Sequence, residues 1–225
     1  MSDLILKYIE KDPISFIHVR ELLDRKYSII FESSDGFIIH DDDVDFTYMS
    51  FNNFEVMKEQ LSKKRYTHYI SYDKEVVDYY EDNDSVIKLH QFVYDSNEMF
   101  MLGDYDIRVL TADYAPLIDS FYKAIGPGET SIGALKRKEV LGIFEDGELA
   151  GIIGRHPEGC VGMLHVFEKY RGKGYAKALE KAIVNKLLKD NQRVFCEIVD
   201  GNEISLKMHS SLGWIKGNKT IYWLV

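Results

Sequence analysis

The sequence has little of what several classes of protein need. Its only two cysteines, Cys160 and Cys196, lie in strand-like segments, and we expect both to be reduced, packed thiols. No apolar run is long enough to cross a bilayer, and the first residues lack the basic start and apolar stretch of a signal peptide. No Cys or His residues have the spacing of metal ligands. The sequence therefore predicts a cytoplasmic protein with no metal and no membrane partner.

Acidic side chains outnumber basic ones, and the net charge of −9 is unevenly distributed. Residues 1–103 carry 11 basic and 21 acidic side chains, whereas residues 104–225 carry 17 and 16. We expect no nucleic-acid partner, because contacts with phosphates dominate that kind of binding. The acidic run at residues 41–45 either attracts a cationic amine at long range or is a solvated loop that aids solubility.

The most informative segment is Arg171-Gly172-Lys173-Gly174-Tyr175-Ala176, between the apolar run at 161–167 and a long amphipathic stretch. A strand that turns through glycines into a helix exposes backbone N–H groups at the positive end of the helix dipole. Glycine has no Cβ, so an anion can approach the backbone closely. The segment therefore predicts a site for a pyrophosphate, although an ordinary strand-to-helix turn can have the same six residues.

Periodicity and turn signals give residues 104–225 the order strand, helix, three strands, helix, strand, helix, strand. Asp146-Gly147 and His156–Gly159 mark turns between the middle strands, and Gly126–Gly128 ends the first helix. The expected strands are 107–110, 140–144, 149–153, 160–167, 193–199 and 220–225. The expected helices begin at Thr111 or Asp113, at Lys173 (to Leu188) and at Glu203 (to Ser211).

The glycine segment resembles the acyl-CoA signature of the GNAT superfamily of N-acetyltransferases. That signature reads Arg or Gln, two residues, Gly, one residue, and then Gly or Ala; Arg171, Gly174 and Ala176 fill it. Downstream, the family commonly has Asn, a small residue, Tyr, Gly and an aromatic residue, where this chain has Asn202, Ser205, His209, Gly213 and Trp214. The tail is also similar, more weakly, to the glycine N-acyltransferase-like branch.

The resemblance covers residues 105–225 and implies an α/β fold, with a mixed, mostly antiparallel sheet flanked by helices. We divide the chain into an N-terminal α/β domain, 1–103, and a GNAT domain, 104–225. The first half shows the later part of the same order of elements, so we interpret it as a smaller, degenerate GNAT copy. No Arg-x-x-Gly-x-Gly sequence follows Phe51, so we expect this half to line the acceptor pocket or to pair with the second half, without binding the cofactor. The strands expected there are 27–31, 37–40, 46–51, 66–71 and 86–94. The expected helices are one that ends near residue 63 and one at 74–80.

The resemblance also implies acetyl-CoA as cosubstrate and assigns residues to it. The backbone of Leu164, His165 and Val166 would hold the pantetheine arm, with an N–H group near Leu164 as the oxyanion donor. The amides of 171–176 would hold the pyrophosphate, and Asn202 and Ser205 would lie near the pantetheine. Residues 122–138 and the N-terminal half would shape the acceptor pocket.

A general base is needed because most of an alkyl amine is protonated at neutral pH. Alternation along the strand places Glu158, Cys160, Gly162 and Leu164 on one side if no bulge intervenes. Glu158 is the first candidate, acting directly or through water, and a solvated turn residue is the competing interpretation. Glu168 or a water molecule is the alternative base. His165 belongs to the opposite face by the same alternation, but a bulge would reverse that choice.

A proton donor for the departing thiolate is the remaining requirement. His209 takes the place of the Tyr that often serves in this family, and imidazolium can donate a proton at neutral pH. A histidine satisfied at the surface is the competing interpretation, and Trp214 is expected in the core.

The resulting hypothesis is an acyl-CoA-dependent N-acyltransferase that transfers acetyl to a primary amine on a small molecule or peptide. Two alternatives stay open: a noncatalytic CoA-binding or regulatory module, and an interaction protein that acts through its acidic first half. The sequence leaves open a homodimer.

Overall fold

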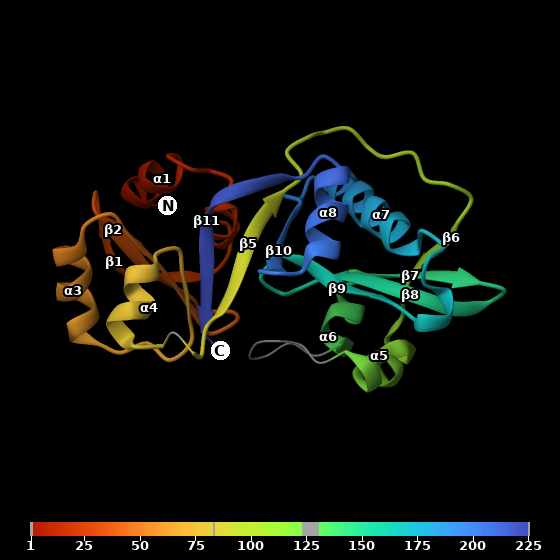
Figure 1. Cartoon of the computed structure of the whole chain (residues 1–225), viewed down its shortest axis with the longest axis horizontal. Coiled ribbons are helices and arrows are strands. Elements are labelled where there is room, and N and C mark those ends of the chain that lie inside the picture. The colour runs from red at the N-terminus through yellow and green to blue at the C-terminus, as the bar shows by residue number, and fades with distance from the viewer. Residues whose placement is uncertain (1, 83, 123–130, 225) are drawn as a thin grey trace. The chain divides into compact units, whose positions relative to one another are not determined.

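The computed structural model describes residues 2–82, 84–122 and 131–224, so the expected break at Gly126–Gly128 lies outside the described residues (Figure 1). Contacts divide the chain into two compact units. The first unit combines Met1–Val93 with Glu197–Val225, and the second is Tyr94–Cys196. The expected domain boundary at 103/104 was placed along the sequence, whereas the two units are defined by contacts, so the boundary stays a prediction. None of the described helices has the length and apolarity needed to cross a membrane.

The first unit is built on a mixed sheet. Its strands lie in the order β1-β2-β3-β4-β11-β5, and neighbours are antiparallel except for the parallel pair β3 and β4. The helix α3 connects this parallel pair. The elements are α1 (Asp3–Ile9), α2 (Ile17–Leu22), β1 (Tyr27–Ser33), β2 (Gly36–Asp41), β3 (Phe46–Phe51), α3 (Phe54–Lys63), β4 (Tyr69–Ser71), α4 (Lys74–Tyr80), β5 (Ile87–Val93), α8 (Glu203–Ser211) and β11 (Ile215–Leu224).

Alternating residues of the strands build a core on each face of this sheet. Phe37 and Ile39 of β2 pack in a cluster with α1 and α2, whereas Ile38 packs with α3 and α4. All three side chains are at most 1% exposed. Because successive strand residues point to opposite faces, a strand covered by helices on both sides is buried at nearly every position. The burial of β2 and β3 follows this rule, and it includes the polar Asp41, Thr47 and Ser50.

The last strand of the chain is an interior strand of the first unit. We expected β11 to begin at residue 220, but it begins at Ile215 and pairs with both β4 and β5. The sequence Lys-Gly-Asn-Lys at 216–219 does not have the apolar alternation of a strand. Contacts with other parts of the first unit explain why it nevertheless belongs to β11. Lys219 forms an ion pair with Asp73 at 2.6 Å (Nζ–Oδ1), and its backbone N–H donates to Ser15 Oγ at 3.0 Å. Tertiary contacts therefore override the weak local propensity.

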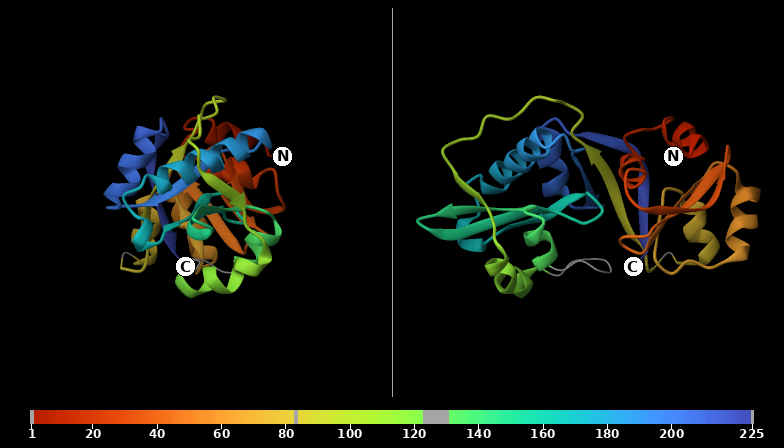
Figure 2. Two further views of the ribbon diagram at one scale, coloured as in Figure 1. Left: turned by 90° about the vertical axis from the view of Figure 1, so that its right-hand side faces the viewer. Right: turned by 180° about the vertical axis from the view of Figure 1, so that it is seen from behind.

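The second unit has strands in the order β10-β9-β8-β7-β6, antiparallel except for the pair β9 and β10. The helix α7 contacts one face of the sheet, and α5 and α6 lie on the other (Figures 1 and 2). The elements are β6 (Asp106–Val109), the 3-10 turn η1 (Ala112–Tyr114), α5 (Ala115–Phe121), α6 (Ser131–Lys136), β7 (Val140–Glu145), β8 (Glu148–Arg155), β9 (Val161–Val166), η2 (Glu168–Tyr170), α7 (Tyr175–Lys189) and β10 (Phe195–Val199).

Local turn chemistry explains two connections in this unit. Asp146 and Gly147 both have positive φ, 52° and 82°, which is the conformation of a tight hairpin turn and confirms that prediction. The expected start of α7 at Lys173 is wrong by two residues. Gly172 and Gly174 have φ of 79° and 82°, which no right-handed helix accommodates, so the helix begins at Tyr175.

Candidate active site

The turn between β9 and α7 leaves backbone donors free. Gly174 is the N-cap of α7 and provides no side-chain cap; the first hydrogen bond of the helix runs from Ala178 N to Gly174 O at 3.0 Å. Within the described residues, the N–H groups of 172–176 have no acceptor. A Cβ placed on Gly172 would meet nothing within 4 Å, so the space before these donors is open. Free amides at the start of a 15-residue helix form a site for an anion.

The charges beside the turn are partly neutralised by one carboxylate. Glu145, the last residue of β7, accepts a hydrogen bond from Lys173 Nζ at 2.5 Å and another from the hydroxyl of Tyr175. These hydrogen bonds hold the pKa of Glu145 below its usual value. The bond to Glu145 also raises the pKa of Tyr175 to about 12. Arg171 donates from Nε to the carbonyl of Val166 at 3.2 Å, which places its guanidinium at the end of β9.

An open pocket of about 240 Å³ lies next to the turn, where the segment 102–105 approaches α7. The hydroxyl of Tyr105 would be 3.8 Å from a Cβ on Gly174. The sequence gave no signal for Tyr105, because it belongs to the linker and not to a motif. The pocket is lined by Leu102, Gly103, Tyr105, Gly174, Lys177, Ala178 and Lys181.

The linker before β6 is attached to α7 through its backbone. The amide of Asn185 accepts from Phe100 N at 2.7 Å and donates to Phe100 O at 2.8 Å, as a neighbouring strand would. The side chains of Met99 and Met101 are nevertheless 55% and 90% exposed. Two hydrogen bonds to Asn185 thus attach the linker to α7, while the side chains of Met99 and Met101 remain exposed.

A β-bulge changes the alternation along β9. Ile152 of β8 is opposite His165, and Gly154 is opposite Gly162, so two residues of β9 face one residue of β8. Met163 has a φ of 56°, the left-handed conformation that bulges often contain. The condition on which we assigned faces to Leu164 and His165 is therefore not met. Within the described residues, β9 is joined to β10 only at Val161 and Cys196.

Glu158 and Glu168 lie outside β9. Glu158 is half-buried in the turn 156–159, which is closed by hydrogen bonds from His156 N to Cys160 O (2.8 Å) and from Gly159 N to His156 O (2.9 Å). Because β9 begins at Val161, strand alternation does not extend to Glu158. Glu168 is exposed in η2. The role of either carboxylate as a base stays a prediction.

The downstream elements of the motif belong to the first unit. Asn202 is the N-cap of α8, and its Oδ1 accepts from Ser205 N at 3.2 Å. His209 is 3% exposed, so the interpretation of it as a surface histidine is wrong. Its Nδ1 lies 2.8 Å from Ser205 O and therefore carries a proton, while its ring packs against Trp214 at 5.0 Å. Trp214 is 5% exposed, which confirms its place in the core.

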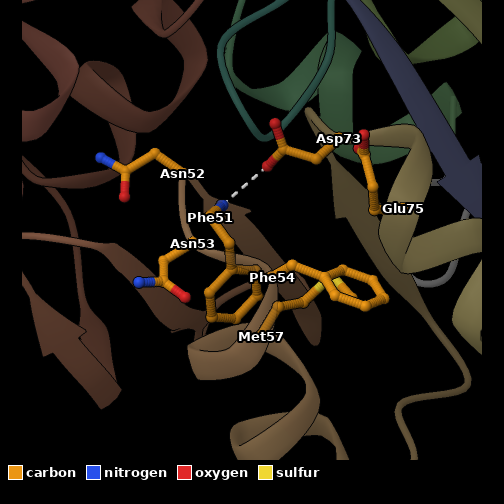
Figure 3. A pocket seen from close by; sticks show the side chains of 7 residues that line it. All are labelled: Phe51, Asn52, Asn53, Phe54, Met57, Asp73 and Glu75. Carbon is orange, nitrogen blue, oxygen red and sulfur yellow. Dashed lines mark hydrogen bonds between the residues drawn. The ribbon is translucent and has the colours of Figure 1, made fainter.

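In the corresponding turn of the first unit, from β3 to α3, side chains accept from several backbone donors; Figure 3 shows the bond from Phe51 to Asp73. Asn53 Oδ1 accepts from the N–H groups of Glu55 (3.0 Å) and Val56 (3.2 Å). The buried carboxylate of Asp73 accepts from Phe51 N at 2.7 Å. A pocket of about 220 Å³ lies there, and its ionisable residues are both acidic; it is lined by Phe51, Asn52, Asn53, Phe54, Met57, Asp73 and Glu75.

Comparisons with known proteins match the second half of the chain to a family model and nearly the whole chain to solved structures. Residues 140–224 match the model of the family described as FR47-like protein. No curated protein matches the sequence significantly. An X-ray structure of a Drosophila protein is similar, with a TM-score of 0.72 and 16% identity, covering 99% of this chain and 95% of that one.

Two bacterial structures share the fold at lower similarity. An acetyltransferase of the GNAT family from Colwellia psychrerythraea has a TM-score of 0.55 and 15% identity, covering 96% of this chain and 92% of that one. A GCN5-related N-acetyltransferase from Kribbella flavida has a TM-score of 0.56 and 12% identity, covering 93% and 94%. The chain thus shares the fold of these acetyltransferases, and its FR47-like segment, residues 140–224, contains the glycine turn.

Proposed function

We propose that the protein is an acyl-CoA-dependent N-acyltransferase that transfers acetyl from acetyl-CoA to a primary amine of a small molecule or peptide. The observation that carries the proposal is the row of free N–H groups at 172–176, at the start of α7. A pyrophosphate needs several donors, positive potential and close backbone approach, and this turn supplies all three.

The residues of the second unit suit the rest of the cofactor as well. The end of β9, residues 164–166, would offer backbone groups to the amides of the pantetheine arm, as an added strand does. An N–H group near Leu164 would donate to the oxyanion that develops on the thioester carbonyl. The family resemblance adds Asn202 and Ser205 of α8 to the pantetheine region; the Oδ1 of Asn202 already caps its helix, so its NH₂ group would be the donor.

Direct attack needs two proton transfers and no covalent enzyme intermediate. The amine nitrogen bonds to the carbonyl carbon, the C–S bond breaks, and the sulfur takes a proton. We keep Glu158, directly or through water, as a proposed base and His209 as the proposed donor to sulfur. Because Nδ1 of His209 already donates to Ser205 O, Nε2 is the nitrogen that would exchange the proton.

Thermal unfolding with acetyl-CoA tests the cofactor site first. A ligand that binds only the folded state raises the melting temperature, by an amount that follows its concentration relative to Kd. No shift at saturating acetyl-CoA would contradict the proposal.

Release of free thiol with a panel of amines then separates an enzyme from a noncatalytic CoA-binding module. We expect thiol release that depends on both acetyl-CoA and an amine. A melting shift without any turnover over a broad panel, including peptides and longer acyl-CoAs, would favour the binding module.

A further inference from the structure

The bulge in β9 brings His165 to the side of the sheet that α5 covers. Residues directly opposite each other on antiparallel strands share a face. Ile152 and Gly154 of β8 are two residues apart and so share a face, and their partners are His165 and Gly162. His165 therefore lies on the same face as Gly162, although three residues separate them.

Contacts identify this face. Ile152 packs in the cluster of α5 and α6, together with Ile118 and Leu135. The ring of His165 stacks on Phe121, the last residue of α5, with 4.4 Å between centroids and 28° between planes. The edge of Phe167 closes another side at 5.1 Å. The imidazole is thus held between two aromatic rings and stays half-buried.

Two more polar rings lie on the same face. A Cβ on Gly162 would collide with Nε2 of His156, so the imidazole of His156 covers that glycine. The hydroxyl of Tyr122, which follows α5, is 3.3 Å from the same nitrogen. The side of β9 facing α5 therefore presents two imidazoles and a phenol, next to an aromatic surface that suits an ammonium group.

We propose that His165, in place of Glu158, is the general base of the acyl transfer and that the amine binds against Phe121 on this face of β9. The inference rests on the proposed function. In this step an ammonium gives one proton to the neutral imidazole of His165 and becomes a nucleophile. Its nitrogen then bonds to the carbonyl carbon as the C–S bond breaks, and the departing sulfur takes a proton from His209. The second proton of the amine passes through water to restore His209, and His165 returns its proton to water.

The surroundings of His165 keep it in the protonation state that a base needs. Burial, followed by the positive charge of Arg171 in the glycine turn, lowers the pKa of His165 below its usual 6.5. Among the residues that the structure describes, Tyr122 and His156 are titratable groups on this face, and β8 contributes the apolar Ile152. The imidazole is therefore neutral at pH 7, and it loses this form only as the pH falls below 6.5.

Substitution of His165→Gln tests the assignment by a pH profile. We expect kcat to fall by roughly 10²–10⁴-fold. The acid limb of the kcat–pH profile, which lies below pH 6.5 in the wild type, should disappear with it. The melting shift caused by acetyl-CoA should be retained, because the side chain of His165 is not part of the anion site. His68→Gln, an exposed histidine of the first unit, is the matched control and should keep the wild-type profile.

Chemical rescue keeps the test informative if glutamine perturbs packing against Phe121. We expect His165→Ala to regain turnover when imidazole is added, which a purely structural histidine would not allow. Wild-type turnover and an unchanged acid limb in His165→Gln would overturn the inference while leaving the proposed function intact. Loss of the acetyl-CoA melting shift in the wild type would instead remove the proposed function itself.

Discussion

Two connections in this chain have the same topology and opposite chemistry. In the first unit β3 leads through α3 to its parallel neighbour β4, and in the second β9 leads through α7 to β10. In the first turn, the carboxylate of Asp73 accepts from Phe51 N, and the amide of Asn53 accepts from the N–H groups of Glu55 and Val56. The second turn has Gly172 and Gly174 in place of capping side chains, and the N–H groups of residues 172–176 have no acceptor within the described part of the chain. The comparison shows that a few side chains decide whether a strand-to-helix turn stabilises itself or remains open to an anion.

The charges beside the two turns also favour an anion at the second turn over the first. Asp73 and Glu75 line the pocket beside the first turn, whereas Lys177 and Lys181 line the pocket beside the second. An anionic cofactor would be repelled by the first pair and attracted by the second. The expectation that the first half does not bind the cofactor stays a prediction, and the charges support it.

The largest expected effect comes from closing the open turn. Gly174→Glu forces a side chain into a left-handed backbone at φ 82° and adds a negative charge, so we expect no detectable CoA binding in a calorimetric titration. Gly213→Glu is the matched control, because Gly213 of the first unit has nearly the same φ, 80°, and open space around it. CoA affinity within about twofold of wild type in Gly174→Glu would show that the anion site is elsewhere.

Removing the carboxylate of the closed turn should cost stability without creating a cofactor site. Asp73 is 8% exposed and accepts from Phe51 N, from Ser50 Oγ and from Lys219 Nζ. Asp73→Ala removes the acceptor that these three donors share and leaves the N–H of Phe51 without one, so we expect a loss of about 2–3 kcal/mol in the free energy of unfolding in urea. Glu75→Ala, at an exposed neighbour, should change it by no more than about 0.5 kcal/mol. Equal effects of the two variants would show that Asp73 does not hold the turn.

Removing the cap of α3 tests the same closed turn more gently. Asn53→Ala should destabilise the protein by about 1 kcal/mol, while Asn53→Asp, which keeps a capping oxygen, should be close to wild type. Neither variant should gain CoA affinity. A gain in Asn53→Ala would mean that capping, and not the acidic pocket, excludes the anion.

The smallest effect concerns the charge balance at the open turn. Glu145→Gln releases Lys173 from its carboxylate partner, so we expect CoA to bind about twofold more tightly at pH 7. The hydrogen bonds from Lys173 and Tyr175 hold the pKa of Glu145 below its usual value. The carboxylate therefore keeps its negative charge at pH 7 and loses it only when the pH falls through this lowered pKa. The advantage of the variant should therefore shrink in strongly acidic buffer. If the gain in CoA affinity of Glu145→Gln did not depend on pH, it would have a cause other than the charge of Glu145.

The parts predicted from sequence are those with local causes. The open turn depends on Gly172 and Gly174, and the hairpin at 146–147 depends on residues that tolerate positive φ. The helix α1 was missed although its signal is local: Ser2 caps it by accepting from Ile5 N, and Ile5, Tyr8 and Ile9 have helical spacing. The short helices α2 and α6 were also missed, and α2 has no side-chain cap to mark its start.

The parts that could not be predicted depend on distant contacts. The bulge in β9 is set by the pairing with β8, and Met163 at its left-handed position has no distinguishing chemistry. The early start of β11 likewise depends on Ser15 and Asp73, which are far away in the sequence. Consequently the open glycine turn could be predicted, whereas the face on which His165 lies could not.

Amide chemical shifts in a CoA titration, followed by NMR of the labelled full-length protein, test the central claim most directly. The account predicts that the backbone amides of residues 172–176 shift on binding, because they are free to donate, and that those of Glu55 and Val56 do not, because Asn53 already accepts from them. Unchanged amides at 172–176 in the presence of saturating CoA would contradict it.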